Sequence, residues 1–489
     1  MSANYLAFDL GAESGRAMLG TLDHGVLSVR ELHRFRNEPV QQHGSLQWDI
    51  RRLWREMQHA LALNEGTRLD SVGVDSWGVD YALIGERGNL LENPYHYRDR
   101  RTDGAMAAVF ERVSRERIYA VTGIQFLPIN TIYQLYAACR RTPDLIDSAR
   151  ALVTIPDLLN YWLTGTLTAE YTVATTTQCI DVRARTWAMH LLEEIGLPAR
   201  LLQPLVEPGT TIGSLQASAS VTAAGTPVVA PACHDTASAV ASVSASGNVA
   251  FLSSGTWSLL GTEVDQPVVT ARAMALNFTN EGGVAGTTRL LKNIGGLWLL
   301  QECRRSWSAA GQAFTYDALL DAASDDALAF RSVFDPDHEQ FLNPDDMPSS
   351  IDAYCARTGQ PAPASPPAYT RAILESLACK YRLVLESLEA VSGRRFDEIR
   401  IVGGGSRNRL LNQLTADATG RMVVAGPAEA TALGNVAMQM LATGAVGSLA
   451  EARLIIERSF PVERFEPVGH DRWDARSRRL EEHMEAARL

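Results

Sequence analysis

Residues 4–22 read NYLAFDLGAESGRAMLGTL: an apolar run, a polar turn containing two glycines, and a second apolar run. This pattern predicts a β-hairpin. Residues 248–263 read NVAFLSSGTWSLLGTE and follow the same plan, and the corresponding alanines, Ala7 and Ala250, lie about half the chain length apart. The repeat predicts two similar domains, each opening with a hairpin, and we expect them to cover residues 1–243 and 244–489.

Strand and helix signals alternate through the rest of the chain. Residues 225–243 and 396–420 each read as a buried strand, a polar or glycine-rich turn and a helix, and residues 369–393 have the apolar spacing of a long helix. Residues 70–84 predict a strand that turns and returns, and the Pro/Ala-rich residues 355–368 predict a surface loop. This mixture predicts α/β domains with mixed sheets flanked by helices.

Composition and charge exclude several classes of function. The net charge of −11 argues against a nucleic-acid-binding surface, so we expect no nucleic-acid partner. The six cysteines form no C-x-x-C pair and no H-E-x-x-H motif occurs, which argues against a structural zinc site. The chain begins close to a predicted strand, and no run of about 18 apolar residues occurs, so we expect a reduced, cytoplasmic protein without a membrane partner.

Two glycine-containing turns could bind phosphate, and a third could let a flat ligand approach its backbone closely. The first, DLGAESGR, ends a strand at Asp9 and offers backbone N–H groups, the Ser14 hydroxyl and the Arg16 charge. The second, LSSGTWSLLG, lies at the equivalent place in the repeat, and the third, IVGGGSRN, follows a later strand without matching a Walker or dinucleotide-binding motif. Each alone could be an ordinary hairpin or strand-to-helix turn, but two equivalent turns favour the binding of a polyphosphate at both ends.

Residues 231–240, PACHDTASAV, place Asp235 between a buried strand and a small-residue helix. A buried, unpaired carboxylate costs several kcal/mol or more, so Asp235 needs a role. One reading is a helix N-cap, which contributes about 1 kcal/mol. The other reading is a general base, and the local residues alone do not separate the two.

Ten motifs of this chain resemble, in order and across nearly its whole length, the FGGY family of carbohydrate kinases. That family is part of the ATPase superfamily that includes actin and the Hsp70 chaperones. The motifs are DLGAESGR, GVDSWGVDY, YRDRRT, TGIQFLPINTIYQL, EYTVATTTQ, HDTASAV, LSSGTWSLLG, NEGG, LKNIGGLWLLQ and IVGGGSRNRLLNQLTADATG. The resemblance implies two actin-like (ribonuclease H-like) domains with the active site in the interdomain cleft. It also implies ATP as co-substrate, Mg²⁺ on its phosphates, and a small sugar as the other partner.

The resemblance also assigns roles to residues of this chain. As ATP contacts it implies Ala12, Glu13, Ser14, Gly15, Arg16, Thr256, Gln301 and Gly404. As sugar contacts it implies Gly78, His234, Asp235, Thr236 and Asn293. Asp235 would be the proton acceptor, and Asp9 would lie near the metal through water.

One position departs from the family pattern. Small hydroxyl residues are usual where this chain has Ala12 and Glu13, and a carboxylate directed at phosphate would repel it. We therefore expect Glu13 to face solvent or to help hold Mg²⁺, with its backbone alone contacting ATP. Around Gly78, one of Asp75 and Asp80 could bind a sugar hydroxyl, with Trp77 packing on the apolar face of the sugar. Both aspartates could instead be hairpin-end residues.

The reaction that the resemblance implies is ATP-dependent phosphorylation of L-rhamnulose to L-rhamnulose 1-phosphate. The alternatives are a kinase for another ketose or polyol, such as L-fuculose, and a non-catalytic sugar- or nucleotide-responsive protein of the same fold. The oligomeric state cannot be read from these motifs.

Overall fold

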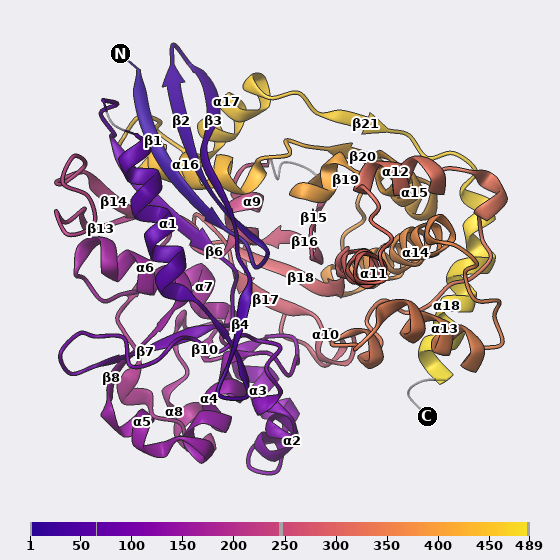
Figure 1. Cartoon of the computed structure of the whole chain (residues 1–489), viewed down its shortest axis with the longest axis horizontal. Helices are drawn as coiled ribbons and strands as arrows, with labels where there is room; N and C mark the ends of the chain where they lie inside the picture. The colour runs from indigo at the N-terminus through magenta and orange to yellow at the C-terminus, as the bar shows by residue number, and fades with distance from the viewer. Residues whose placement is uncertain (1, 65, 244–247, 487–489) are drawn as a thin grey trace. The chain divides into compact units, whose positions relative to one another are not determined.

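The computed structural model describes residues 2–64, 66–243 and 248–486 (Figure 1). The chain forms two compact units: unit 1 comprises Met1–Ser244, Glu263–Leu290 and Ala430–Phe460, and unit 2 comprises Ala245–Thr262, Leu291–Glu429 and Pro461–Leu489. The predicted boundary between residues 243 and 244 adjoins residues 244–247, which lie outside the described residues, and it stays a prediction.

Unit 1 is built on a six-stranded mixed sheet in the order β13-β14-β6-β1-β2-β3. The strands are β1 (Ala3–Leu10), β2 (Ser14–Asp23), β3 (Val26–Arg36), β6 (Ser71–Ser76), β13 (Thr210–Ser214) and β14 (Pro227–Ala230). The first hairpin is confirmed, since β1 and β2 pair antiparallel. β6 lies parallel to β1 on one side and to β14 on the other, so the carboxyl ends of three strands meet at one edge.

The sheet of unit 1 is covered on both faces, because side chains alternate along β1. Leu6 and Phe8 belong to one buried cluster with residues of α1 (Ile50–Leu63) and α6 (Ile155–Thr164). Tyr5 and Ala7 belong to another with residues of α16 (Ala430–Ala442). The late segment Ala430–Phe460 joins unit 1 because the apolar side chains of α16 are buried against this second face.

Unit 2 repeats the strand plan of unit 1. Five neighbouring strands of a seven-stranded sheet follow it, in the order β16 (Trp257–Val264), β15 (Val249–Ser254), β19 (Glu398–Val402), β20 (Met422–Ala425) and β21 (Glu463–Phe465). Successive pairs are antiparallel, parallel, parallel and antiparallel, as they are for β2-β1-β6-β14-β13. The predicted α/β fold of two similar domains with mixed sheets is therefore confirmed.

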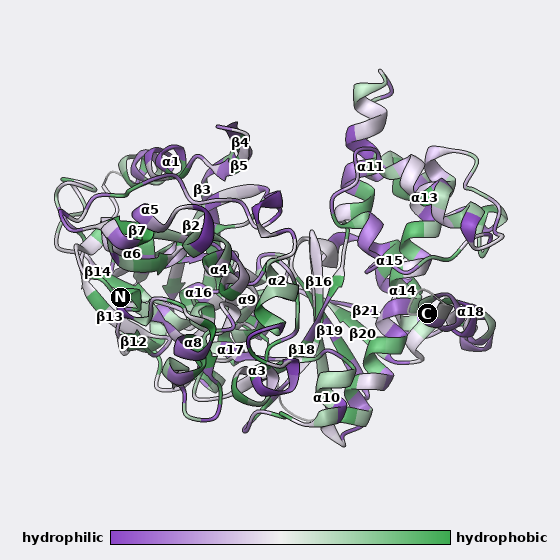
Figure 2. Ribbon diagram, turned by 90° about the horizontal axis from the view of Figure 1, so that it is seen from below, coloured by the Kyte–Doolittle hydropathy of each residue, from purple (hydrophilic) through white to green (hydrophobic). Residues whose placement is uncertain are grey.

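Helices flank the sheets. In α1, hydrophobic and hydrophilic residues both occur along the helix (Figure 2), and the buried ones include Ile50, Leu53 and Met57. Unit 1 also contains α2 (Ala105–Phe110), α3 (Arg115–Thr122), α4 (Thr131–Arg141), α5 (Pro143–Ser148), α7 (Tyr171–Thr176), α8 (Met189–Ile195), α9 (Asp235–Ala241), α10 (Ala271–Ala275) and α17 (Leu449–Ser459). Unit 2 contains α11 (Trp298–Ala309), α12 (Tyr316–Ala323), α13 (Met347–Arg357), α14 (Pro366–Ser392), α15 (Arg409–Thr419) and α18 (Asp474–Ala486). Within the described residues, no helix has both the length and the apolar character needed to cross a membrane.

The prediction for residues 70–84 was wrong about strand pairing. β7 (Tyr81–Gly85) does not return to β6 but pairs antiparallel with β8 (Ala149–Thr154). The chain changes direction at Val79, which has the left-handed φ of 65°. Four donors then hold the Asp80 carboxylate, so β7 leaves the sheet that contains β6.

The long helix is confirmed as α14, which ends at Gly393 in the left-handed conformation. The predicted loop 355–368 is shorter than expected, because α13 extends to Arg357 and α14 begins at Pro366. Proline is tolerated in the first turn of a helix, where its missing N–H has no intrahelical partner, and this explains the early start of α14.

Candidate active site

The predicted sugar and metal residues of unit 1 gather at the carboxyl ends of β1, β6 and β14. Asp9 lies opposite Asp75 in the parallel register of β1 and β6. The Ser76 N–H donates to the Cys233 carbonyl at 2.9 Å, which joins the end of β6 to the segment before Asp235. Ligand sites of open α/β sheets form at this edge of parallel strands.

The first predicted phosphate turn is short and open to solvent at Glu13. Gly11 N–H donates to the Ser14 carbonyl at 2.9 Å, and Glu13 between them is exposed. A Cβ at Gly15 would lie 2.3 Å from the Phe35 ring, so this glycine is required by packing. The guanidinium of Arg16 pairs with the Asp9 carboxylate across the hairpin. The exposed side chain of Glu13 fits a turn that uses its backbone toward phosphate.

Asp235 is the first residue of α9, and the N-cap position belongs to His234. The Asp235 Oδ1 accepts hydrogen bonds from the Thr236 N–H at 2.5 Å and from the Thr236 hydroxyl at 3.1 Å. The side chain of Asp235 keeps 28% of its exposure. A carboxylate that is held on one oxygen and still accessible can accept a proton from a bound hydroxyl.

The pKa of Asp235 is raised above its ordinary value. Burial is the largest cause, and the negative charge of Asp9 adds to it, while His234 and the Thr236 hydrogen bonds oppose the change. A higher pKa makes the ionised carboxylate a stronger proton acceptor than an ordinary surface aspartate.

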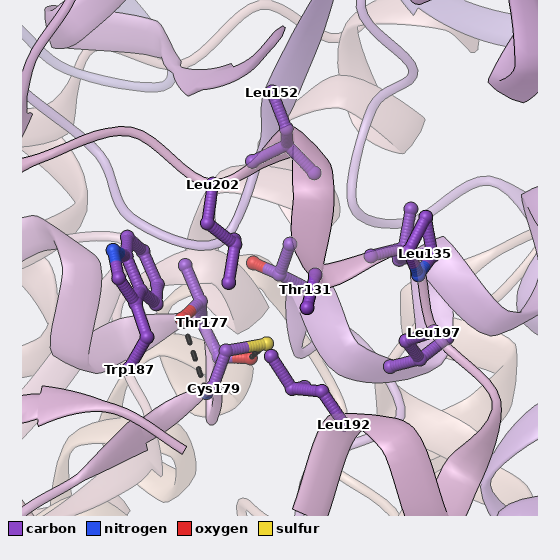
Figure 3. Close-up of a pocket in the computed structure, with 11 residues that line it drawn as sticks. Thr131, Leu135, Leu152, Thr177, Cys179, Trp187, Leu192, Leu197 and Leu202 are labelled. Atoms are coloured by element: carbon purple, nitrogen blue, oxygen red, sulfur yellow. Dashed lines mark hydrogen bonds between the residues drawn. The ribbon is translucent and has the colours of Figure 1, made fainter. Parts of the chain in front are cut away.

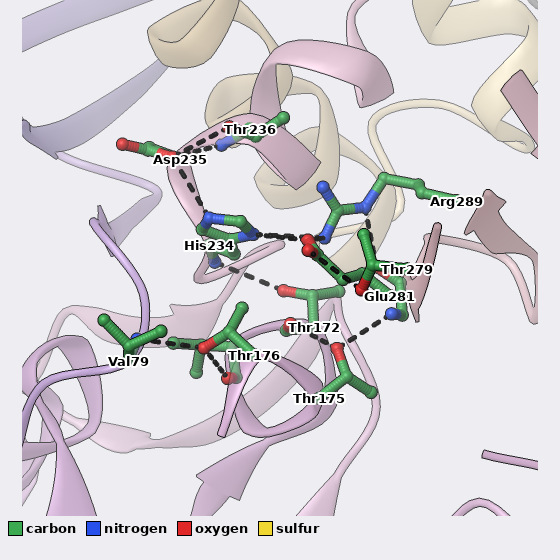
Figure 4. Close-up of polar contacts among 12 residues, drawn as sticks. Val79, Thr172, Thr175, Thr176, His234, Asp235, Thr236, Thr279, Glu281 and Arg289 are labelled. Atoms are coloured by element: carbon green, nitrogen blue, oxygen red, sulfur yellow. Dashed lines mark hydrogen bonds and ion pairs between the residues drawn. The ribbon is translucent and has the colours of Figure 1, made fainter. Parts of the chain in front are cut away.

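The turn at Gly78 is held against α7 through the contact of Val79 with Thr176, which Figure 4 shows. A Cβ at Gly78 would lie 2.8 Å from the Thr176 Oγ1, so only glycine fits without a shift of the turn. The Val79 N–H donates to the same hydroxyl at 3.0 Å, and the Val79 carbonyl accepts from Thr131 at 2.5 Å. These bonds hold Val79 in its left-handed conformation, which costs of order 1–3 kcal/mol for such a residue.

The residues that flank Gly78 form a buried scaffold. The indole N–H groups of Trp77 and Trp48 donate to Asp80 at 3.0 and 2.7 Å, and both rings are buried. Asp75 is also buried and accepts a hydrogen bond from Asn435 at 2.6 Å. The structure therefore favours a structural role for Asp75, Trp77 and Asp80 over contact with a sugar.

In unit 2, three of the predicted ATP-binding elements converge on Ser254 and Gly255. Gln301 lies on α11, and Leu297 is the N-cap residue of this helix. The Leu297 N–H donates to the Gly255 carbonyl at 2.9 Å. Gly255 directly precedes Thr256 in the second predicted turn. A Cβ at Gly405 would lie 2.0 Å from the Ser254 Oγ, whereas one at Gly404 would have no described atom within 4 Å.

The fourth predicted residue of unit 2, Asn293, lies on β18 (Thr288–Gly295). The end of this strand is fixed by a hydrogen bond, in which Gly295 N–H donates to Asp337 Oδ1 at 2.6 Å. Lys380, almost fully buried on α14, lies 2.9 Å from Asp337 Oδ2. Asn293 therefore lies two residues before Gly295, whose position this hydrogen bond fixes.

The described part of the chain contains no magnesium site made of protein ligands alone. Within residues 2–64, 66–243 and 248–486, no group of three His, Cys, Asp or Glu side chains could hold a metal ion. Mg²⁺ usually keeps several waters and binds through one or two carboxylates together with substrate phosphates. Asp9, beside the first phosphate turn, fits that mode of binding.

Two site-neighbouring residues were not predicted. Glu281 on β17 (Thr279–Gly282) and Arg289 on β18 lie against His234 in unit 1 (Figure 4). Glu281 belongs to the NEGG motif, which the sequence singled out without giving the glutamate a role. Arg289 lies near the start of β18, a strand that also contains Lys292 and Asn293, and only the structure reveals its partners.

A small pocket elsewhere in unit 1 is apolar (Figure 3). Leu152, Trp187, Leu192 and Leu202 are among the residues around it, and its accessible lining is almost wholly non-polar. None of the predicted site residues is among those that the structure places around this pocket. Because it lacks converging polar groups, it does not fit a sugar or a nucleotide.

Comparisons with known proteins agree with the motifs. Residues 4–242 match the N-terminal domain model, and residues 250–443 the C-terminal domain model, of the FGGY family of carbohydrate kinases. The chain is 45% identical over 480 residues to rhamnulokinase of Bacteroides thetaiotaomicron, covering 97% of this chain and 98% of the relative. It is also 45% identical to rhamnulokinase of Pectobacterium atrosepticum, with 95% and 93% covered.

Solved structures share the fold at low sequence identity. Xylulose kinase of Lactobacillus acidophilus superposes with a TM-score of 0.79 at 17% identity, covering 99% of this chain and 98% of that one. Glycerol kinase of Plasmodium falciparum with ADP gives 0.75 at 14% identity, covering 99% and 97%.

Proposed function

The chain belongs to the FGGY family of carbohydrate kinases and is a phosphotransferase that acts on a sugar, and from this we propose that its substrate is L-rhamnulose. The proposed reaction transfers the γ-phosphoryl group of ATP to the 1-hydroxyl and gives L-rhamnulose 1-phosphate and ADP. The supporting relatives, named rhamnulokinase, are 40–45% identical over at least 94% of this chain. The observation that carries the chemistry is the accessible carboxylate of Asp235 at the edge of the sheet.

In the proposed mechanism Asp235 accepts the proton of the attacking hydroxyl. Its Oδ1 is held by Thr236, which fixes the plane of the carboxylate. Gly78, His234, Thr236 and Asn293 are proposed to hold the sugar. Positioning of the hydroxyl and neutralisation of phosphate charge supply most of the catalysis in phosphoryl transfer.

The proposed ATP contacts are Ala12, Glu13, Ser14, Gly15, Arg16, Thr256, Gln301 and Gly404. Bound Mg²⁺ would neutralise charge on the β- and γ-phosphates. Asp9 would hold that ion through water, and Arg16 would fix the orientation of the Asp9 carboxylate. Backbone N–H groups of the first turn would bind phosphate oxygens, with the exposed Glu13 side chain directed to solvent.

A sugar panel tests the proposal. Initial rates of ADP release with L-rhamnulose, L-fuculose and D-xylulose should rank L-rhamnulose first by kcat/KM, and NMR of the product should show phosphate on carbon 1. Faster turnover of L-fuculose or D-xylulose would remove the substrate assignment but keep the kinase. ATP hydrolysis without any phosphorylated sugar would point to an actin-like ATPase instead.

A further inference from the structure

His234 is surrounded by three charged residues of unit 1 (Figure 4). Its Nε2 lies 3.4 Å from Asp235 Oδ1. On the other side of the ring, Nδ1 lies 3.1 Å from Arg289 Nη2 and 3.4 Å from Glu281 Oε2. The proposed base and a buried arginine thus contact opposite nitrogens of one imidazole.

Several contacts hold the Arg289 side chain next to Nδ1 of that imidazole. Its side chain is fully buried, Nε donates to the Gly282 carbonyl at 2.8 Å, and Nη2 lies 3.1 Å from Glu281 Oε2. Burial lowers the pKa of Arg289, while the charges of Glu281 and Asp235 raise it. A guanidinium so placed cannot turn away from His234 without breaking these bonds.

The Arg289 contact decides which nitrogen of His234 carries the proton. A guanidinium has N–H donors and no acceptor, and Arg289 Nη2 is nearer to Nδ1 than Glu281 Oε2 is, at 3.1 Å against 3.4 Å. Glu281 Oε2 in turn pairs with the same Nη2 at 3.1 Å, which favours Nδ1 as the acceptor of the Arg289 N–H. Nδ1 therefore holds a lone pair, and the proton of the neutral ring sits on Nε2. That N–H faces Asp235 Oδ1. Protonation of Nδ1 would set two N–H groups against each other at 3.1 Å.

We propose that Arg289 is a positioning residue that holds His234 as the neutral tautomer protonated on Nε2, and thereby orients Asp235. The inference rests on the proposed function in one respect, that Asp235 is the base. Thr236 and His234 both approach Oδ1 of Asp235, so Oδ2 is the oxygen that takes the proton of the sugar hydroxyl. Glu281 balances the charge of Arg289.

NMR of protein labelled with ¹⁵N-histidine tests the tautomer without any substrate. The His234 signals are assigned by their loss in the His234→Asn variant. At neutral pH the wild type should show a protonated Nε2 and an unprotonated Nδ1. A proton on Nδ1, with or without one on Nε2, would overturn the proposal. Because no sugar is present, this result stands even if the kinase assignment fails.

Kinetics test the consequence for catalysis. The double variant Arg289→Met/Glu281→Gln removes both charges, so neither is left buried and unpaired. We expect loss of the single tautomer and a fall in kcat of about tenfold or more, with the sugar KM changed less than about threefold, because a wrong histidine tautomer disables a proton-transfer site. Arg289→Lys keeps a charged donor and should recover part of kcat.

A matched control separates this role from a general effect on folding. Arg371 and Glu375 on α14 form another buried ion pair, at 2.6 Å, in unit 2. Arg371→Met/Glu375→Gln should keep kcat within about threefold. An equal fall in this control, or unchanged kcat in the Arg289→Met/Glu281→Gln variant, would refute the positioning role. If the Arg289→Met/Glu281→Gln variant does not fold, the wild-type tautomer and the Arg289→Lys kinetics decide.

Discussion

Replacement of Gly434 by alanine should displace the helix that carries Asp235. Gly434 lies on α16, where a Cβ would stand 1.7 Å from the Ser238 carbonyl oxygen of α9. Real Cβ contacts of this kind keep at least 3.0 Å, so the two helices must separate by roughly 1.3 Å. Overpacking of this kind costs about 1–3 kcal/mol. The higher helix propensity of alanine offsets about 1 kcal/mol of this loss in the free energy of unfolding.

The larger effect is expected on catalysis, because Asp235 is the first residue of α9. A misplacement of about 1 Å can cost about 100-fold in rate, so kcat should fall by about that factor. Urea unfolding should report a loss of up to about 2 kcal/mol, which is the overpacking cost less the gain in helix propensity. A coupled assay of ADP release should report kcat. Gly447→Ala is the control, since its Cβ would meet Glu451 Oε2 at 3.5 Å, an ordinary contact. If Gly434→Ala keeps full kcat, contact with α16 does not position Asp235.

Two further predictions concern stability and substrate binding. Burial raises the pKa of Asp157 from 3.8 to about 7. Between these values the folded state holds a proton that the unfolded state releases. The free energy of unfolding should therefore fall by about 4 kcal/mol as pH rises from about 4 to about 7. Asp157→Asn should flatten this dependence in urea unfolding measured at about pH 5 and about pH 8, and an unchanged slope would contradict the burial of an uncharged Asp157. Gly78→Ala should push the turn off Thr176 and cost about one hydrogen bond, which raises the sugar KM about tenfold. The ATP KM should not change, and an unaltered sugar KM would place Gly78 outside the sugar site.

Local signals predicted the elements of the fold well. The two hairpins carry their glycine and serine turns within a few residues, and the strand-turn-helix units at residues 225–243 and 396–420 formed as expected. The pairing of β7 with β8 was missed, because strand partners depend on contacts far along the chain. The return of Ala430–Phe460 to unit 1 was missed for a similar reason, since it depends on burial of α16 against β1.

The candidate site was predicted less completely. Motifs led to Asp235 and its neighbours, and the structure adds that His234, not Asp235, occupies the N-cap position of α9. Nothing in the sequence shows that Arg289 approaches His234, because the two residues are 55 positions apart and no motif joins them. The surroundings of Trp77 and Asp80 likewise became clear only from the buried hydrogen bonds that join them.

The central claim is that Asp235 is the general base of a sugar kinase. Single-turnover phosphoryl transfer to L-rhamnulose, compared between wild type and Asp235→Asn, tests it most directly. Asparagine keeps the size of the side chain and removes its basicity, so the rate should fall by about 10²–10⁴ while the sugar dissociation constant changes less than about threefold. An Asp235→Asn enzyme that transfers phosphate at the wild-type rate would contradict the account.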